Sequence, residues 1–288
     1  MRMRLNHSHA NDSTKSRNLL FGCRVSNSVN ETTSQFARIT LQLTPPIAHL
    51  SLIHPPVNVI DLQMMDELMS ALSEIESLPA ISTIILSGEG RCFSAGVDVA
   101  AHTPDKIAAM LEKFHGLVRA ILNAKKITLA VVHGDCLGGA AELAMVCDFA
   151  ITTSTATWAF PEIKLGCFPP IAATALSALG GQKRAADLIL TGRSISGTEA
   201  AAIGLATVAV PDDQLSSAVQ EKLIALSRLS ASALAVAKKA IYAWDSMHFD
   251  KGLARAEKIY LEELLQTDDA QEGIRAFLEK RSPRWTNR

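Results

Sequence analysis

The sequence TLAVVHGDCLGGAAELA, residues 128–144, contains a strand pattern, a turn and a helix pattern in immediate succession. The apolar run 128–132 predicts a strand, and the small residues after Gly139 predict a helix. Backbone N–H groups in the first turn of a helix have no intrahelical partner, so they suit a developing negative charge. The turn at Gly138 and Gly139 is therefore a candidate oxyanion-binding site.

Two glutamates lie in otherwise apolar sequence near this turn. Glu142 falls one helical turn after Gly139 and on the same face. Glu162 lies in the segment FPEIKLG, residues 160–166. An uncompensated buried carboxylate costs on the order of several kcal/mol, so two of them facing one cleft predict general acid and base chemistry on a water molecule. The alternatives are that Glu142 caps a neighbouring group and that Glu162 pairs with Lys164 or with an arginine elsewhere.

Composition limits the possible classes of protein. The 288 residues are 48% hydrophobic and carry a net charge of −1, which favours a globular enzyme over a nucleic-acid or membrane-surface binder. No apolar run approaches the roughly 20 residues of a membrane span. The scattered, odd-numbered cysteines predict free thiols in a reducing, cytoplasmic compartment, and none of their spacings predicts a metal site. These cysteines are Cys23, Cys92, Cys136, Cys147 and Cys167.

Residues 1–35 differ from the rest of the chain. They carry five basic residues against only Asp12 and Glu31, with many serines and asparagines and few apolar residues. Such a segment cannot bury enough apolar surface to order itself. We expect a disordered or processed N-terminal extension, with a transit peptide and an upstream start codon as alternative explanations.

Beyond residue 35, strand and helix patterns alternate. Strands are predicted at 36–43 and 47–53, around the turn at Pro45 and Pro46, and a helix is predicted after a cap at Asp61. A strand at 82–86, a helix at 104–122, the strand at 128–132 and apolar residues 149–151 continue the pattern. Strand–helix–strand repeats imply an α/β fold with parallel strands.

The pattern after residue 151 is mainly helical. One short strand is predicted at 206–210, and the helices are predicted at 171–179, 182–190, 196–203, 212–229, 231–245, 249–265 and 268–280. We therefore expect a core at 36–225 followed by a helical region at 226–288.

A third glycine-rich segment, GEGRCFSAGVD at residues 88–98, follows the strand at 82–86. Small residues there let a ligand approach the backbone closely. Taken alone, the segment fits a flexible connection equally well.

Together these loops resemble the crotonase superfamily, also called the enoyl-CoA hydratase/isomerase family. The motifs that carry the resemblance are FSAGVD at 93–98, HGDCLGGAAELA at 133–144, CD at 147–148 and PEIKLG at 161–166. The resemblance implies a crotonase fold of repeated ββα units, a C-terminal trimerisation region, a homotrimer or homohexamer, and an acyl-CoA substrate without a separate cofactor.

The resemblance also implies roles for individual residues. The N–H groups of Val97 and Gly139 would hold the thioester oxygen, and Glu142 and Glu162 would handle water and protons. Since family members with isomerase or hydrolase activity often lack one of these glutamates, the pair favours hydratase chemistry. The remaining substrate or CoA contacts would be Ser94, Ala95, Gly96, Asp98, Gly138, Phe168 and Pro169.

Two departures and several further segments refine this resemblance. Ala140 stands where the family usually has a third glycine, and CFPPIAAT at 167–174 replaces a Gly- and Thr-rich run beside the acyl pocket. The chain is most similar to hydratases that convert cyclohexa-1,5-diene-1-carbonyl-CoA to 6-hydroxycyclohex-1-ene-1-carbonyl-CoA in anaerobic aromatic degradation. Segments outside the general motifs support this similarity, at 97–105, 114–119, 193–197, 260–264 and 276–282. The alternatives are a linear enoyl-CoA hydratase or isomerase of β-oxidation and a non-catalytic binding protein of the same fold.

Other polar residues carry weaker signals. His102 and His115 could line the acyl pocket or shuttle protons, but single histidines in such segments are more often packed in the core or exposed. Asp148 is expected to make structural hydrogen bonds rather than to catalyse.

Overall fold

The computed structural model describes residues 33–34, 36–103 and 105–286. Most of the predicted N-terminal extension lies outside these residues. Its last part contributes strand β1 (Thr33–Ser34), which pairs with β2 (Ile39–Thr44).

A seven-stranded sheet forms the centre, in the order β1-β2-β3-β4-β5-β7-β10. As predicted, β2 forms an antiparallel hairpin with β3 (Ile47–Leu52). From β3 onward every neighbouring pair is parallel, as the strand–helix alternation implies. These parallel strands are β4 (Thr83–Gly88), β5 (Ile127–Val132), β7 (Phe149–Thr153) and β10 (Val208–Val210).

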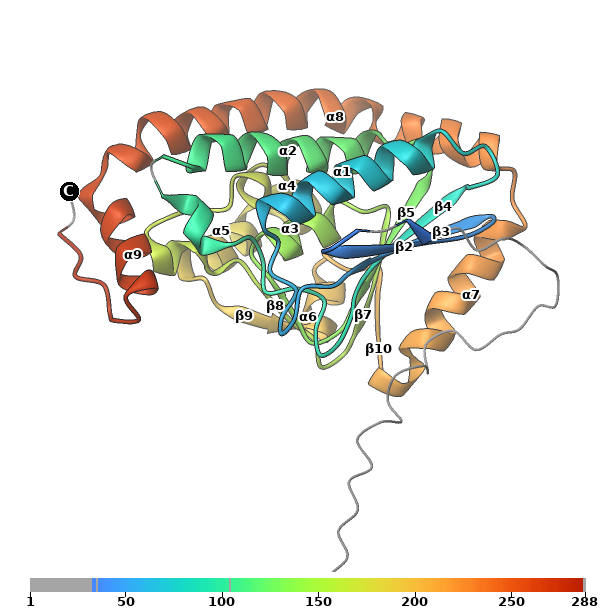
Figure 1. Cartoon of the computed structure of the whole chain (residues 1–288), viewed down its shortest axis with the longest axis horizontal. Coiled ribbons are helices and arrows are strands. Elements are labelled where there is room, and N and C mark those ends of the chain that lie inside the picture. Colours follow the sequence, from blue (N-terminus) through green and yellow to red (C-terminus); the bar gives the residue numbers. More distant parts are fainter. Residues whose placement is uncertain (1–32, 35, 104, 287–288) are drawn as a thin grey trace, which may run out of the picture. The chain divides into compact units, whose positions relative to one another are not determined.

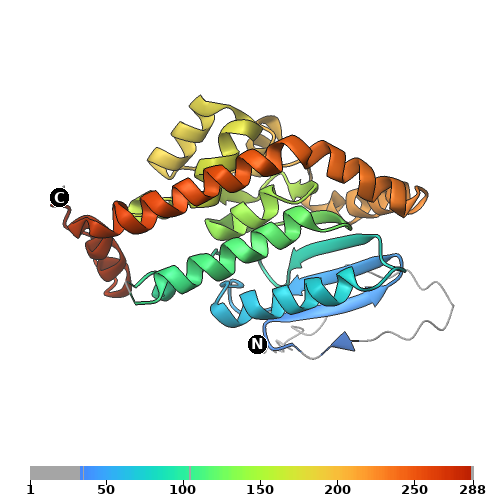
Figure 2. The same cartoon turned by 90° about the horizontal axis from the view of Figure 1, so that it is seen from above.

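Helices cover both faces of this sheet. On one face α1 (Leu62–Glu76), α2 (Ile107–Asn123) and α8 (Ala231–Glu262) lie side by side (Figures 1 and 2). Leu68 of α1 and Leu86 of β4 line the same small apolar cavity there. On the other face α7 (Leu215–Ser227) packs its Leu215, Val219 and Leu223 against the alternate positions of the same strands, such as Ile85. The strands are buried on both faces, which explains their nearly continuous apolar sequence.

A second sheet has three short strands that the sequence did not predict. They are β6 (Asp135–Leu137), β8 (Thr157–Ala159) and β9 (Ser194–Ser196). Helix α3 (Gly139–Met145) begins directly after β6, so this sheet fixes the turn that starts the helix.

Helices make up most of the rest of the chain. Their predicted pattern needs one correction. The predicted break between 245 and 249 is wrong, because residues 231–251 contain no glycine or proline and α8 continues through them. The remaining elements are η1 (Val99–His102), η2 (Pro161–Leu165), α4 (Pro170–Gly180), α5 (Gln182–Thr191), α6 (Gly197–Ala202), η3 (Asp212–Gln214), η4 (Leu264–Gln266) and α9 (Asp268–Leu278). Among the described helices, none is long and apolar enough to cross a membrane.

Candidate active site

The loop that carries Val97 is held along one edge by a short parallel bridge. The N–H of Ile60 donates to the carbonyl of Gly96 at 2.9 Å, and the N–H of Asp98 donates to the carbonyl of Ile60 at 3.1 Å. In a parallel bridge the two residues on either side of one partner make both hydrogen bonds. The N–H of the residue between them, here Val97, therefore points away from the neighbouring strand. Val97 therefore directs its N–H away from Ile60.

The other side of this loop meets the turn before α3. The N–H of Leu137 donates to the carbonyl of Ser94 at 3.1 Å. A Cβ built on Gly96 would lie 2.6 Å from the carbonyl oxygen of Leu137 and 3.7 Å from the nitrogen of Gly139. Only glycine allows this approach, and it brings the Val97 backbone close to the first residue of α3.

These contacts bring the two predicted oxyanion donors together. Within the described part of the chain, neither the N–H of Val97 nor that of Gly139 donates a hydrogen bond. Gly139 begins α3, where the partial positive charge of the helix end adds to its N–H dipole. The arrangement is suited to an oxygen atom that gains negative charge.

Asn58 and Ser94 support the Val97 loop from inside. The Asn58 amide nitrogen donates to the carbonyls of Glu89 and Cys92 at 2.8 and 3.0 Å. The Ser94 hydroxyl donates to the Asn58 carbonyl at 2.6 Å and accepts from the N–H of Gly96 at 3.1 Å. Ser94 is fully buried, and its hydroxyl stabilises the loop through these two hydrogen bonds. Sequence reasoning missed Asn58, because its hydrogen bonds and its φ of 52° become visible only in the folded chain.

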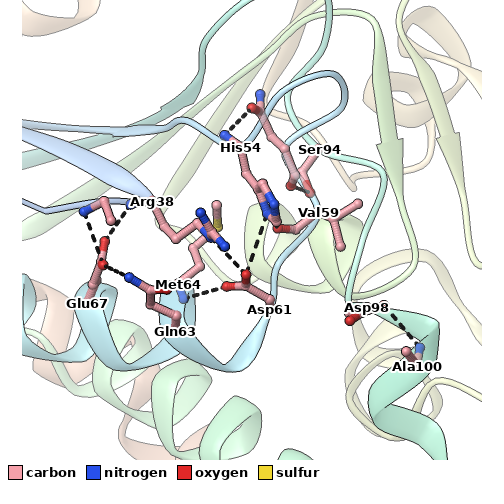
Figure 3. Close-up of polar contacts among 12 residues, drawn as sticks. Arg38, His54, Val59, Asp61, Gln63, Met64, Glu67, Ser94, Asp98 and Ala100 are labelled. Atoms are coloured by element: carbon pink, nitrogen blue, oxygen red, sulfur yellow. Dashed lines mark hydrogen bonds and ion pairs between the residues drawn. The ribbon is translucent and has the colours of Figure 1, made fainter.

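Asp61 fixes the segment behind this loop (Figure 3). Its carboxylate accepts from the Met64 N–H at 2.8 Å, which caps α1 as predicted, and from Arg38 Nε at 2.8 Å. His54 Nδ1 lies 2.7 Å from the carbonyl oxygen of Val59 in the same segment. Burial raises the pKa of Asp61, but the Met64 amide and Arg38 outweigh it and hold the pKa below its usual range.

Glu142 is buried in α3 with only 3% of its surface exposed. Its Oε1 accepts a hydrogen bond from the Ala172 N–H at 2.8 Å, in the first turn of α4. Glu142 therefore does cap a neighbouring helix, which was the alternative considered for it. Burial raises its pKa to about 7, although the amides of Ala172 and Ile171 oppose that rise.

Glu162 lies opposite, in η2 directly after Pro161. A Cβ built on Gly138 would be 2.6 Å from Glu162 Oε1, so this oxygen lies against the bare backbone of the Gly138 turn. The second oxygen, Oε2, is buried without a hydrogen-bond partner among the described residues. No salt bridge to Lys164 or to any described arginine forms.

The charge of Glu142 affects the proton affinity of Glu162. Burial raises the pKa of Glu162 to about 8, and the negative charge of Glu142 contributes to that rise. Because two carboxylates in one buried site cannot both ionise easily, these groups lose their protons less readily than exposed glutamates do. Such a pair can accept a proton on one side and donate one on the other.

The segment that links the backbone of Glu162 to the carboxylate of Glu142 carries Phe168. The N–H of Cys167 donates to the Glu162 carbonyl at 3.1 Å, and α4 follows with the Ala172 N–H that holds Glu142. Phe168 is half-buried, and its ring centroid lies 5.2 Å from that of Tyr260 in α8. Sequence reasoning gave Tyr260 no role, because nothing local shows that α8 returns to this segment.

The other predicted contact residues lie on the loop that carries Val97 and on the segment that carries Phe168. The Ala95 N–H donates to the carbonyl of Val57 at 2.9 Å, and Asp98 caps η1 by accepting from the Ala100 N–H at 3.0 Å. Pro169 is buried at the start of α4.

Both histidines have structural partners. His102 Nδ1 lies 3.1 Å from the carbonyl oxygen of Asp98, and His115 Nδ1 lies 2.6 Å from Glu257 Oε1, between α2 and α8. Burial lowers the pKa of each. These contacts favour the packed role considered for them.

Asp148 makes structural hydrogen bonds, as expected. It accepts from the Thr128 N–H at 2.7 Å and from Lys238 Nζ at 2.8 Å. Across the part of the chain that the structure describes, no group of three or more histidine, cysteine or acidic residues could hold a metal ion.

Comparison with known proteins identifies relatives over most of the chain. The family model described as enoyl-CoA hydratase/isomerase matches residues 44–288. Cyclohexa-1,5-dienecarbonyl-CoA hydratase of Thauera aromatica is 38% identical over 251 residues, which cover 87% of this chain and 97% of that protein.

Solved structures with the same fold agree. An enoyl-CoA hydratase from Mycobacterium avium subsp. paratuberculosis has a TM-score of 0.79 at 26% identity, covering 88% of this chain and 100% of that one. An enoyl-CoA hydratase/isomerase from Xanthobacter autotrophicus Py2 has a TM-score of 0.77 at 26% identity, covering 85% and 97%. These matches confirm the fold and the family resemblance that the motifs predicted.

Proposed function

The chain belongs to the enoyl-CoA hydratase/isomerase family, and we propose that within this family it hydrates a cyclic dienoyl-CoA thioester, cyclohexa-1,5-diene-1-carbonyl-CoA, to 6-hydroxycyclohex-1-ene-1-carbonyl-CoA. The observation that carries the proposal is that buried Glu142 and half-buried Glu162, whose Oε2 is buried, both have raised pKa values, with Glu162 Oε1 against the Gly138 turn. The similarity to the Thauera aromatica hydratase supports the cyclic substrate.

In the proposed reaction the thioester oxygen accepts hydrogen bonds from the N–H groups of Val97 and Gly139. Addition of a hydroxyl group to the carbon β to the carbonyl moves negative charge onto that oxygen. Donors already in place for this charge need no reorganisation, and removal of one such donor typically costs about 2.7 to 4 kcal/mol of transition-state stabilisation.

Glu142 is the better candidate for the base. The amide of Ala172 stabilises its ionised form, so it loses its proton more readily than Glu162 does. Ionised Glu142 would remove a proton from water as the oxygen attacks the ring. Protonated Glu162 would then deliver its proton to carbon at the far end of the resulting dienolate, which completes the addition of one water molecule.

The cyclic acyl group is supported by the segment beside Glu162. Phe168 and Pro169 stand there in place of the glycines and threonines usual in fatty-acid hydratases, and Tyr260 packs behind Phe168. Aromatic side chains offer a planar ring a larger and flatter contact surface than they offer an extended alkyl chain.

Two substrates in ¹⁸O-labelled water test the proposal. Cyclohexa-1,5-diene-1-carbonyl-CoA should give a hydroxylated product that carries one ¹⁸O atom by mass spectrometry, with crotonyl-CoA turned over at least tenfold less efficiently. Efficient hydration of crotonyl-CoA would instead support a linear enoyl-CoA hydratase. Rearrangement without incorporation of ¹⁸O would support an isomerase, and turnover of neither thioester would support a non-catalytic binding protein.

We further propose a cytoplasmic homotrimer or homohexamer that needs no cofactor beyond the CoA of its substrate. The buried free cysteines support a reducing compartment. Light scattering after size-exclusion chromatography measures the oligomeric state directly.

A further inference from the structure

We propose that Tyr260 is a positioning residue that determines the acyl-group preference of the enzyme, by holding the Phe168 ring against a planar acyl group. This inference rests on the proposed function, because it takes the substrate to be an acyl-CoA bound beside Glu162. It adds to that function a residue from α8, which belongs neither to the oxyanion loops nor to the glutamate pair.

The segment that contains Phe168 is attached to the backbone of Glu162 and to the carboxylate of Glu142. At its beginning the Cys167 N–H donates to the carbonyl of Glu162 at 3.1 Å. At its end the N–H of Ala172 donates to Glu142 at 2.8 Å. Phe168 lies between these two attachments, six residues after Glu162 and four before Ala172, so an acyl group bound beside Glu162 would lie close to this segment.

Tyr260 lies behind this segment. Its side chain is 2% exposed, whereas Phe168 is half-buried, and the two rings are tilted by 59° with their centroids 5.2 Å apart. This geometry is a favourable aromatic contact. Phe168 therefore presents the accessible part of the pair, and Tyr260 fixes the orientation of Phe168 from behind.

The Tyr260 hydroxyl adds a second attachment through Cys167. It interacts with the Cys167 thiol, and this thiol donates to the carbonyl of Leu165 at 3.5 Å. Burial raises the pKa of Tyr260, and Cys167 and the two carboxylates raise it further. The phenol therefore stays neutral, which excludes a role as a base and leaves packing and hydrogen bonding.

The acyl-group preference follows from shape. A planar ring contacts Phe168 over a wide area only if Phe168 keeps its orientation, whereas an extended alkyl chain adapts to a mobile ring. Removal of the aromatic ring of Tyr260 should therefore weaken the binding of ring-bearing thioesters more than that of linear ones.

Calorimetric binding of two unreactive thioesters, benzoyl-CoA and butyryl-CoA, tests the inference. For Tyr260→Leu we expect the dissociation constant of benzoyl-CoA to rise about tenfold and that of butyryl-CoA to rise less than about threefold. Tyr260→Phe keeps the ring contact, so its ratio of the two constants should stay within about threefold of wild type. Tyr242→Leu is the matched control, since it removes the same side chain from the same helix about 27 Å away along its axis.

Equal weakening of both thioesters in Tyr260→Leu would show a merely structural role and overturn the inference, as would an unchanged ratio. If Tyr260→Leu does not fold, Phe168→Leu must change the ratio in the same direction, and no change in that variant overturns the inference. Wild-type binding of benzoyl-CoA without hydration of the dienoyl substrate would refute the proposed function alone. Wild-type binding of neither thioester would refute both.

Discussion

Glu142 and Glu162 occupy a buried site that accommodates only one negative charge easily. Glu142 receives an amide hydrogen bond there, whereas Glu162 keeps one buried oxygen without a described partner. This difference gives the two acids different proton affinities in a shared environment. The same arrangement lowers the stability of the folded protein, because ionisation of both groups is unfavourable inside it.

Removal of either carboxyl group should slow catalysis strongly without preventing binding. We expect Glu142→Gln and Glu162→Gln each to lower kcat by about 100-fold or more, with KM changed less than about threefold, because each variant loses one proton-transfer step. Steady-state kinetics with the dienoyl thioester measures both constants. Glu112→Gln, on the exposed side of α2, should match wild type. Retention of more than about a third of kcat in either active-site variant would contradict the assigned roles.

The raised pKa values also predict how stability depends on pH. Glu162 has an ordinary value of 4.5, which the folded protein raises to about 8. Between these values the folded state binds more protons than the unfolded state, so its stability falls as pH rises from about 5 to about 8. Glu162→Gln does not ionise and should lose less stability over this interval. Urea unfolding at pH 5, 7 and 9 measures the difference between variant and wild type, and a difference that does not grow with pH would contradict the prediction.

At the scale of elements, α9 reaches the Glu162 segment through a close backbone contact. A Cβ built on Gly273 of α9 would lie 2.1 Å from the carbonyl oxygen of Leu165 at the end of η2. One built on Gly166 would lie 2.6 Å from the carbonyl oxygen of Asp269. The helix that follows α8 therefore fixes the end of the segment that carries Glu162.

Gly273→Ala should separate α9 from η2. The added methyl group meets backbone that cannot rotate away, so we expect the free energy of unfolding to fall by about 1 to 3 kcal/mol. Activity should fall as well, because the Glu162 segment loses its support. Urea unfolding and initial rates measure the two effects. Gln271→Ala, at an exposed position on the same helix, is the control and should match wild type in both assays.

The sequence predicted the helices and strands whose apolar residues recur at a regular spacing. Apolar alternation and caps such as Asp61 located the parallel strands and α1, to within a few residues. The strands of the second sheet have only three residues each, which is too short for a period, so they were missed. The predicted break in α8 was wrong because weak helix propensity around Met247 does not end a helix that packs against α2 and α4.

The candidate site was also predicted only in part, because only some of its residues stand out in the local sequence. Glycine turns and acids in apolar sequence are local signals, and they indicated Gly139, Glu142 and Glu162. The family resemblance added Val97, and the fold brings the Val97 loop close to Gly139 and the Gly138 turn close to Glu162. The Ala172 amide and Tyr260 act through contacts between distant segments. Only the path of the chain shows such contacts, so no local pattern could have predicted them.

At the scale of the whole molecule, α8 connects separate parts of the fold along one helix (Figure 2). Near its start Lys238 reaches Asp148 at the beginning of β7. Further along, Glu257 contacts His115 of α2, and Tyr260 then packs against Phe168. The helix thus joins the central sheet, the helical layer and the segment beside the glutamate pair. Loss of its first attachment should therefore destabilise the whole fold.

Lys238 provides that first attachment. Only 5% of Lys238 is exposed, and its Nζ also donates to the carbonyl of Lys126 at 3.0 Å. Lys238→Met keeps most of the side-chain volume but leaves the Asp148 charge buried without its cation, which should lower the free energy of unfolding by about 3 to 5 kcal/mol. Lys239→Met changes the adjacent, exposed lysine and should stay within about 0.5 kcal/mol of wild type. Urea unfolding monitored by circular dichroism measures both variants.

The partner of Lys238 gives a second check on the same interaction. In Lys238→Met with Asp148→Asn, no buried charge remains unpaired, so the double variant should be more stable than Lys238→Met alone. The introduced amide side chain still offers an oxygen to the N–H of Thr128, which preserves the link between β5 and β7. If the two lysine variants lose equal stability, or if the double variant recovers none, the buried ion pair is not what holds α8 to the sheet.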